Sequence, residues 1–587
     1  MDPFTRIVSW GDLPGPWELL KDPKVDKIFH NAKHDSQAAE AVDKEINGRI
    51  EDTAIMAKVL FSGQKAGLKD LSEQWLGVPK DDEEALHAAV QAARDEAKAL
   101  GWKIADDSGR WGDQPFMADF WLPQVATELE RYARLDPERT MLLFHLLNPM
   151  LDTDPRLRAH YEAELKLLKV VMDMERRGVR CHSHVCRFEN SKAKMKAKVH
   201  TARLEAGLRE LAFPVPPKVL KANKGQLFNV NSPNQIRALA YDHLKFPVKY
   251  YTDKGNPATD AHALGAMKHP LLMEILNVKA QGKTQEFFDT YLMHSHVCPK
   301  TKVEILHPSF KQIGTVTFRF SCTCPNLQNV PDAFGTRSLV PIQARMPFGP
   351  RPGKVWLHAD WSQIEMWIFA GEANDKAMLE DLHTGSLHNA TANRIYGKGR
   401  NIVAEEEAHG HRNSKNKAKV LNFGVVFCMG VDTMADALEC SRSEAKRNLA
   451  FYYDAYKDIR PFMDRMIAQA QRDGYIWNRH GWRLEVDKEM AYRAVNYKVQ
   501  SGAAAHMKEK MLWLDNFYRT HPEIGAELVL TIHDEIVTEV EEAKILPYLP
   551  MIRAELEDHR GKWPEFPKLP IEYKITRERW DISEKVK

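Results

Sequence analysis

The chain has 587 residues, with 83 Lys plus Arg and 81 Asp plus Glu, so its formal net charge is only +2. This length suits three or four domains, and seven cysteines argue against a disulfide scaffold and for a reducing compartment. No apolar run is long enough to cross a membrane and no signal peptide is evident, so we expect a cytoplasmic protein without a membrane partner.

The first unit is expected to span residues 1 to about 150. Three of its segments combine acidic or aromatic side chains with apolar flanks: H-N-A-K-H-D (30–35), E-D-T-A-I-M-A-K-V-L (51–60) and R-Y-A-R-L-D (131–136). Residues 81–117 are polar and Ala-rich, then carry Gly, Asp and Trp, which predicts a helix followed by a loop.

Residues 155 to about 305 are predicted to be mostly helical. The segment 160–179 is amphipathic and reaches Gly178, a typical helix C-cap. Four lysines follow within 191–198, and Lys218, Lys221 and Lys224 extend the basic stretch. Such a run is usually a solvated face, whereas in a domain that grips a nucleic-acid duplex it would contact phosphates.

The pentapeptide H-S-H-V-C occurs twice, at 182–186 and 294–298, with Cys181 beside the first copy. Histidine and cysteine at this density can bind zinc. Because the spacing differs from the usual C-x-x-C pair, we do not expect a structural zinc site and interpret the repeat as chance similarity between two exposed loops.

A strand-to-helix junction is predicted within 354–371, with Asp360 at the carboxyl end of the strand. Val355–Leu357 favour a strand, and apolar residues then follow helical spacing. Ser362 and Glu365 match a capping box, so the helix should begin just after the acid. An ordinary turn is the alternative, since Asp is common at such junctions.

A basic helix is predicted within 412–430. Two lysines and two phenylalanines recur every four residues and form one stripe: Lys415, Lys419, Phe423 and Phe427. A second face is apolar: Ala418, Leu421 and Val425. The stripe suits a triphosphate and a stacked base, while the alternative is an amphipathic helix with a solvated lysine edge.

Residues 528–540 predict a β-hairpin with His533-Asp534-Glu535 at its tip, because two apolar, β-branched runs flank this polar triplet. If Asp534 and Asp360 meet in a cleft, their hard oxygen ligands suit Mg²⁺. Two such ions can activate an attacking hydroxyl and stabilise a leaving phosphate oxygen. A simple hairpin turn is the alternative.

Together these motifs resemble a known family. D-W-S-Q-I-E (360–365), K-x-x-x-K-x-L-N-F-G (415–424) and H-D-E (533–535) resemble motifs A, B and C of the family A DNA polymerases, the bacterial DNA polymerase I family with its phage relatives. The resemblance extends to most of residues 155–587 through further segments: 315–331, 474–483, 495–505 and the terminal E-R-W-D (578–581).

The resemblance implies an α+β multidomain fold, a right-hand polymerase with an antiparallel palm sheet and helical thumb and fingers. An RNase H-like α/β exonuclease-type domain, apparently truncated, would precede it. The expected boundaries are 1–150 for the exonuclease-like domain, 151–305 for the thumb, 306–385 and 481–587 for the palm, and 386–480 for the fingers.

The implied function is a DNA-templated DNA polymerase that adds dNTPs to a primer 3′-hydroxyl with two Mg²⁺ ions, or Mn²⁺ in their place. Asp360, Asp534 and the Trp361 carbonyl would hold metal, and Lys419 would protonate the leaving pyrophosphate. The implied nucleotide-binding residues are Gln363, Glu365, Arg412, Lys415, Lys419, Phe423 and Phe427. The implied DNA contacts are Arg319, Asn326, Gln328, Asn496, Gln500 and His533.

Two positions depart from the family pattern. Lys415 stands where the family usually has arginine, which gives up bidentate phosphate binding. Phe318 replaces a glycine beside Arg319, so that contact is expected to be reshaped.

The first unit is similar to the later motifs of the 3′–5′ proofreading domain. Asp35 and Asp136 would then be metal ligands, and Tyr132 would position the attacking water. The family's first motif, an acidic D-x-E, does not occur in the 34 residues before Asp35. We therefore expect no useful proofreading from this chain.

The expected partners are primer–template DNA and dNTPs, with replication accessory proteins as further candidates, and the protein is expected to be a monomer. The lack of a 5′-nuclease region favours a phage or viral source, in which case the compartment is the host cytoplasm. The alternative function is a non-catalytic nucleic-acid-binding protein with a decayed polymerase fold. Retention of Asp360, Asp534, Lys419 and Glu365 together argues against decay.

Overall fold

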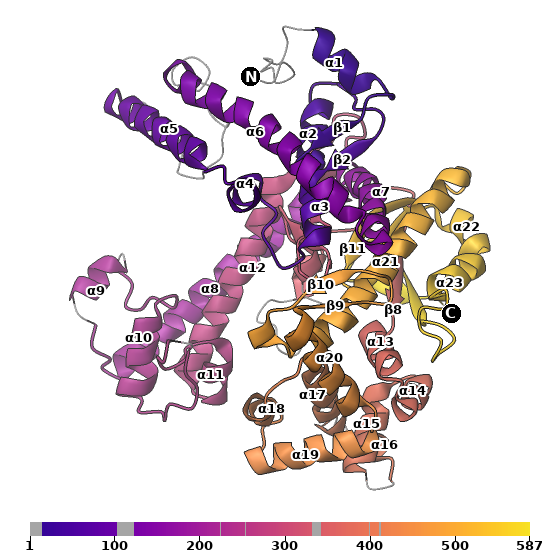
Figure 1. Ribbon diagram of the computed structural model, residues 1–587. Coiled ribbons are helices and arrows are strands. Elements are labelled where there is room, and N and C mark those ends of the chain that lie inside the picture. The colour runs from indigo at the N-terminus through magenta and orange to yellow at the C-terminus, as the bar shows by residue number, and fades with distance from the viewer. Residues whose placement is uncertain are drawn as a thin grey trace.

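The computed structural model describes residues 14–101, 122–215, 217–223, 225–252, 254–330, 342–397, 400–409 and 413–586. A central sheet lies between three helical regions, and the N-terminal unit, the α8–α12 pair and the α13–α20 region extend from it in different directions (Figure 1). This is the right-hand architecture expected from the sequence.

The N-terminal unit has two short parallel strands surrounded by helices. Its elements are α1 (Pro14–Lys21), β1 (Lys27–Phe29), α2 (Ala32–Glu40), β2 (Ile50–Asp52), α3 (Thr53–Leu60), α4 (Leu68–Leu76), α5 (Asp81–Ala99) and α6 (Leu122–Leu151). Asp52 ends β2 and caps α3, because its side chain accepts hydrogen bonds from the Ala54 and Ile55 amides. The helix predicted from residue 81 is confirmed as α5, whereas the loop predicted after it lies mostly outside the described residues.

The second region is built on the long helices α8 and α12, which pack against each other and carry smaller helices at their far end (Figure 1). Its elements are α7 (Pro155–Arg177), β3 (Val179–Arg180), α8 (Ser183–Glu210), α9 (Pro217–Ala222), α10 (Pro233–Arg237), η2 (Ala238–His243), α11 (Ala261–Ala266), α12 (Pro270–His294), β4 (Ser295–Val297) and β5 (Glu304–Leu306). The helix predicted to end at Gly178 is confirmed, since this residue follows α7 with φ 65°.

The two H-S-H-V-C copies do not form two exposed loops, so that interpretation was wrong. The first copy begins α8 and buries Cys186 against Cys181, with 3.9 Å between their sulfurs. The second copy runs from the end of α12 into β4. Across the described parts of the chain, no group of three or more His, Cys, Asp or Glu side chains is placed to hold a metal ion.

The central sheet is antiparallel, with strand order β11-β12-β8-β13-β14. Its strands are β8 (Val355–Trp361), β11 (Glu527–Ile532), β12 (Glu535–Val540), β13 (Ile571–Thr576) and β14 (Ser583–Lys585). Two smaller hairpins lie outside it, β6 (Ser309–Lys311) with β7 (Ser321–Thr323) and β9 (Tyr475–Trp477) with β10 (Arg483–Glu485). In β8 the first five residues are all buried, as expected for a central strand.

Helices between β8 and β9 form the third region, the expected fingers: α13 (Ile364–Ala373), α14 (Lys376–His383), α15 (Leu387–Tyr396), α16 (Ile402–Ala408), α17 (Asn413–Val426), α18 (Val431–Ala437), α19 (Arg442–Ala455) and α20 (Ile459–Asp473). The remaining elements are η3 (Leu327–Asn329), η4 (Ile342–Arg345), η5 (Lys488–Met490), α21 (Arg493–Thr520), α22 (Glu542–Ile545), η6 (Leu546–Tyr548) and α23 (Leu549–Glu557).

The N-terminal unit does not have a core to itself. Ile55 and Leu60 of α3 belong to one buried cluster with Phe318, Trp482 and Ala505 from later in the chain. Among the helices that the structure describes, none is both long and apolar enough to span a membrane.

Candidate active site

Asp360 and Asp534 lie side by side although they come from separate motifs. Asp360 is near the end of β8, and the hairpin of β11 and β12 places Asp534 at its tip. β12 pairs with β8 so that Glu535 lies opposite Asp360, and the Trp361 amide donates to the Asp534 carbonyl over 3.1 Å. The predicted hairpin is confirmed.

Both aspartates line one cleft of about 450 Å³. The other residues in its lining include Gln328, Arg345, His533, Glu535 and Lys574. His533 has a left-handed backbone, with φ 52°, which lets the hairpin reverse within two residues. The sheet therefore presents acidic side chains and a few cations to one shared space.

Burial disfavours the charge on both aspartates. It raises the pKa of Asp534 to about 7, against the lowering effect of Arg319, whose Nη2 lies 3.6 Å from the Asp534 carboxylate. The pKa of Asp360 is also raised, first by burial and then by Glu535, with Lys574 opposing at 3.2 Å. A cation bound between these carboxylates would stabilise their charged forms.

Glu535 differs from Asp360 and Asp534 because its pKa is lowered and a histidine contacts its carboxylate. Burial raises the pKa of Glu535, but His358 on β8, together with Lys574 and Arg345, outweighs this effect and holds the pKa below its ordinary value. The His358 Nδ1 contacts the Glu535 carboxylate, and its Nε2 lies 2.8 Å from the Thr576 hydroxyl. Glu535 is thus fixed in position beside Asp360.

The predicted capping box is wrong. Helix α13 begins at Ile364, and Gln363 precedes it in a left-handed conformation with φ 57° and no side-chain cap. The Glu365 carboxylate instead pairs with Arg319, because this guanidinium reaches the first turn from a distant segment. The Gln363 side-chain oxygen is buried without a hydrogen-bond partner among the described residues.

Helix α17 has the two faces that its sequence predicts. Ala418, Leu421 and Val425 are buried. On the stripe, Lys415 and Phe423 are half-buried, whereas Lys419 and Phe427 are exposed. Arg412 lies outside the described residues.

His388 on α15 was missed by the sequence reasoning. Its ring centroid lies 5.6 Å from that of Phe423, and its Nδ1 lies 3.0 Å from the Asn422 amide nitrogen. Burial, together with the charges of Lys419 and Lys415, lowers the pKa of His388 to about 4. Because α15 and α17 meet only in the fold, no local pattern marks this histidine.

The residues expected to contact DNA have different surroundings. Arg319 is engaged by Glu365 and Asp534, so it is not free for a groove contact in this structure. Gln328 is buried and donates to the Thr531 carbonyl over 3.3 Å, and the Asn326 side-chain oxygen accepts the Gln328 and Asn329 amides. Two further candidates lie on α21: Asn496 and Gln500. His533 is exposed and lines the cleft.

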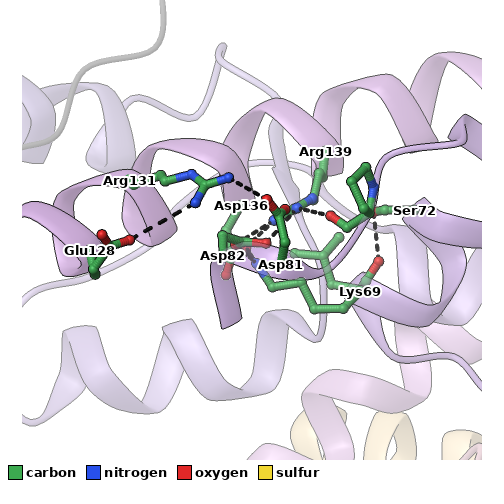
Figure 2. A network of polar contacts seen from close by, with 10 residues as sticks. Lys69, Ser72, Asp81, Asp82, Glu128, Arg131, Asp136 and Arg139 are labelled. Carbon is green, nitrogen blue, oxygen red and sulfur yellow. Dashed lines mark hydrogen bonds and ion pairs between the residues drawn. The ribbon is translucent and has the colours of Figure 1, made fainter. Parts of the chain in front are cut away.

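The acids expected in the N-terminal unit do not form a comparable site. Tyr132 and Asp136 lie on α6 and line a cleft of about 510 Å³ that Asp35, on α2, does not line. Figure 2 shows the Asp136 carboxylate within a network of basic side chains. Lys69 contacts Asp136 directly, and Arg139 lies 3.6 Å from it.

Asp82 completes this network and was not anticipated. Its fully buried carboxylate accepts from Lys69 at 2.6 Å and from both terminal nitrogens of Arg139 at 2.7 Å. The Lys69 ammonium also lies 4.1 Å from the centre of the Tyr132 ring. Basic side chains therefore surround the Asp136 carboxylate in this structure, and its expected role as a metal ligand stays a prediction.

Two models of known protein families match this sequence, one over the N-terminal unit and one over most of the rest. A sequence model described as DNA polymerase family A matches residues 203–580, and one described as 3′-5′ exonuclease matches residues 11–152. DNA polymerase I of Pseudomonas aeruginosa is 28% identical over 542 residues, covering 89% of this chain and 53% of the relative. The thermostable DNA polymerase I of Thermus filiformis is 30% identical over 469 residues, covering 74% and 52%.

The chain spans about half the length of these curated relatives. Both relatives are bacterial, so the expected phage or viral source has no support. The expected lack of proofreading is not supported either, because an exonuclease model matches the first unit. The solved POL domain of Pol1 from M. smegmatis, in complex with DNA primer-template and dNTP, has the same fold. Its TM-score is 0.76 at 22% identity, covering 96% of this chain and 88% of that one. Since the polymerase model covers more than half of its residues, this chain belongs to DNA polymerase family A.

Proposed function

We propose that this chain is a DNA-directed DNA polymerase that adds dNTPs to the 3′-hydroxyl of a primer. The observation that carries the proposal is the meeting of Asp360 and Asp534 in one cleft, with the pKa of each carboxyl raised by burial. The solved M. smegmatis relative, described with primer-template DNA and dNTP, supports the choice of substrates.

The donor set fits Mg²⁺, with Mn²⁺ as a substitute. The Asp360 and Asp534 carboxylates and the Trp361 carbonyl are hard oxygen ligands, which such ions prefer. When bound, a pair of these ions lowers the pKa of the attacking hydroxyl and stabilises the leaving phosphate oxygen. Asp360 and Trp361, on β8, and Asp534, in the tight turn between β11 and β12, would hold these ions at the end of the sheet.

Helix α17 is proposed to bind the incoming nucleotide. Lys415 and Lys419 supply positive charge for the triphosphate, and the Phe423 ring supplies a surface for the sugar and base. Lys419 can donate a proton to the leaving pyrophosphate, and such help is typically worth roughly 10²–10⁴ in rate. Neutral His388, beside Phe423 and Asn422, can donate a hydrogen bond to the same triphosphate.

Primer extension with Mg²⁺ and four dNTPs tests the proposal. Wild-type protein should extend the primer, and Asp534→Ala should lose extension while duplex binding and thermal unfolding persist. Duplex binding by the wild-type chain without any extension would favour the alternative, a non-catalytic protein with a decayed polymerase fold.

We also propose that the chain has no useful proofreading. The support is the pairing of Asp136 with Lys69 and Arg139. A primer with a mismatched 3′ end should not be shortened when dNTPs are withheld. Rapid, Mg²⁺-dependent shortening that Asp35→Ala abolishes would contradict this proposal.

The expected domain boundaries are retained as part of the proposal: 1–150 exonuclease-like, 151–305 thumb, 306–385 and 481–587 palm, and 386–480 fingers. Primer–template DNA and dNTPs are the proposed partners, with replication accessory proteins as further candidates.

A further inference from the structure

One face of the central sheet gathers three carboxylates. Asp360 on β8 lies opposite Glu535 of β12 on one side and opposite Glu572 of β13 on the other. Lys574 lies two residues beyond Glu572 on β13, so it points to the same face. The alternating residues of β13, Tyr573 and Ile575, are buried on the opposite face.

Each acid of this region has its own cationic or histidine neighbour. Glu535 contacts His358, Glu572 lies 2.8 Å from the Lys585 ammonium, and Asp534 lies 3.6 Å from Arg319. Lys574 forms an ion pair with Asp360, and its Nζ lies 3.2 Å from the Asp360 Oδ2. Of these contacts, only the one from Lys574 occupies an oxygen of Asp360, the carboxylate proposed to bind metal.

We propose that Lys574 is the internal counter-ion of Asp360, which a divalent cation must displace to bind. The inference rests on the proposed function, in which Asp360 is a metal ligand. The ammonium donates to Oδ2 and so uses a lone pair that the ion needs. It also places a like charge beside the ion, which weakens binding.

Lysine suits this role because its charge stands on a flexible four-carbon stem. The Lys574 side chain is 31% exposed in the cleft, so it has room to leave Asp360 without unfolding the sheet. Lys574 is therefore a positioning residue. It balances the negative charge of Asp360 before a metal ion binds, and it thereby sets the metal concentration at which the site fills.

The test measures binding of Mn²⁺ alone to the full chain, without DNA or nucleotide, by electron paramagnetic resonance. Lys574→Met removes the charge and keeps most of the stem, so it should tighten Mn²⁺ binding about fivefold or more, as is typical for coupling between neighbouring groups. Lys574→Arg keeps the charge and should stay within about twofold of wild type. Lys585→Met removes the neighbouring cation from Glu572 and is the matched control, also expected within about twofold.

Adding Asp360→Asn to Lys574→Met should abolish the gain, because the competed ligand is then absent. The inference is overturned if Lys574→Met leaves Mn²⁺ binding unchanged or weakens it, or if Lys585→Met tightens it equally. If Lys574→Met unfolds, Lys574→Gln replaces it under the same criteria. Failure of the proposed function is distinct, since Asp360→Asn in the wild-type background would then leave both Mn²⁺ binding and primer extension unchanged.

Discussion

The cleft of Asp360 and Asp534 and the network of Asp82 and Asp136 both bring together acids from separate elements. In the cleft, burial raises the pKa of both acids. In the network, burial also acts on Asp82, but hydrogen bonds from Arg139 and Lys69 outweigh it and hold the pKa of Asp82 well below its ordinary range. Proximity of acids therefore does not define a metal site. What matters is how many basic side chains hold the carboxylate oxygens: only Lys574 contacts Asp360, whereas Asp82 accepts from Lys69 and from both terminal nitrogens of Arg139.

The same substitution in both regions should give opposite results. Asp360→Asn should lower the rate of primer extension by at least about 10³-fold, because the hydroxyl loses the charged ligand of its activating ion. Asp136→Asn should leave extension within about twofold, since its carboxylate serves the network of the first unit. Single-turnover extension rates measure both, and equal losses would remove the distinction between the two regions.

The network of Asp82 and Asp136 should contribute to the stability of the fold and not to primer extension. Asp82→Ala removes the fully buried carboxylate shared by Lys69 and Arg139 and leaves Asp136 alone to balance both cations, so it should lower the free energy of unfolding by about 3–5 kcal/mol. Asp95→Ala, on the exposed side of the same helix, should change it by less than about 0.5 kcal/mol. Denaturant unfolding compares them, and a loss of less than about 1 kcal/mol for Asp82→Ala would show that the network is not structural.

Asp534 should make the cleft pH-sensitive in the absence of divalent metal. Its carboxyl holds a proton more tightly in the folded chain, so folding loses stability as the pH rises from about 4 towards about 7. Asn cannot lose this proton, so the stability of Asp534→Asn relative to wild type should increase by about 2–4 kcal/mol between pH 4 and pH 8. Thermal unfolding in EDTA measures this, with Asp95→Asn as the exposed control. A gain that does not depend on pH would contradict the assignment.

The smallest expected effect concerns substrate choice on α17, the helix proposed to supply the nucleotide to the cleft of Asp360 and Asp534. A tyrosine hydroxyl at position 423 could replace the 3′-hydroxyl that a dideoxynucleotide lacks. Phe423→Tyr should therefore reduce discrimination against ddNTPs by about 2–13-fold, the value of one hydrogen bond of 0.5–1.5 kcal/mol. The ratio of kcat/KM for ddNTP and dNTP measures this, and Phe427→Tyr on the same stripe is the control. An unchanged ratio in Phe423→Tyr would place its ring away from the sugar.

Local patterns predicted the parts of the site that depend on one segment. Alternation and helical periodicity were enough for β8, the hairpin at Asp534 and the buried face of α17. They failed where the deciding contact comes from far along the chain. Arg319 reaches Glu365 and replaces the expected capping box, and Lys574 reaches Asp360 from another strand. Since ion pairs of this kind have no spacing rule in sequence, only the fold shows them.

The buried cluster that joins α3 to Trp482 and Ala505 bears on how such an enzyme can change over evolutionary time. A few substitutions around Asp136 could remove exonuclease activity during evolution. The whole N-terminal unit could not be deleted as easily, because it shares a buried cluster with the rest of the chain. Deletion would expose Trp482 and its apolar neighbours to water and remove the Gly63 amide that donates to Glu485 over 3.1 Å. Selection on synthesis alone would then preserve the N-terminal unit for its packing against the rest of the chain.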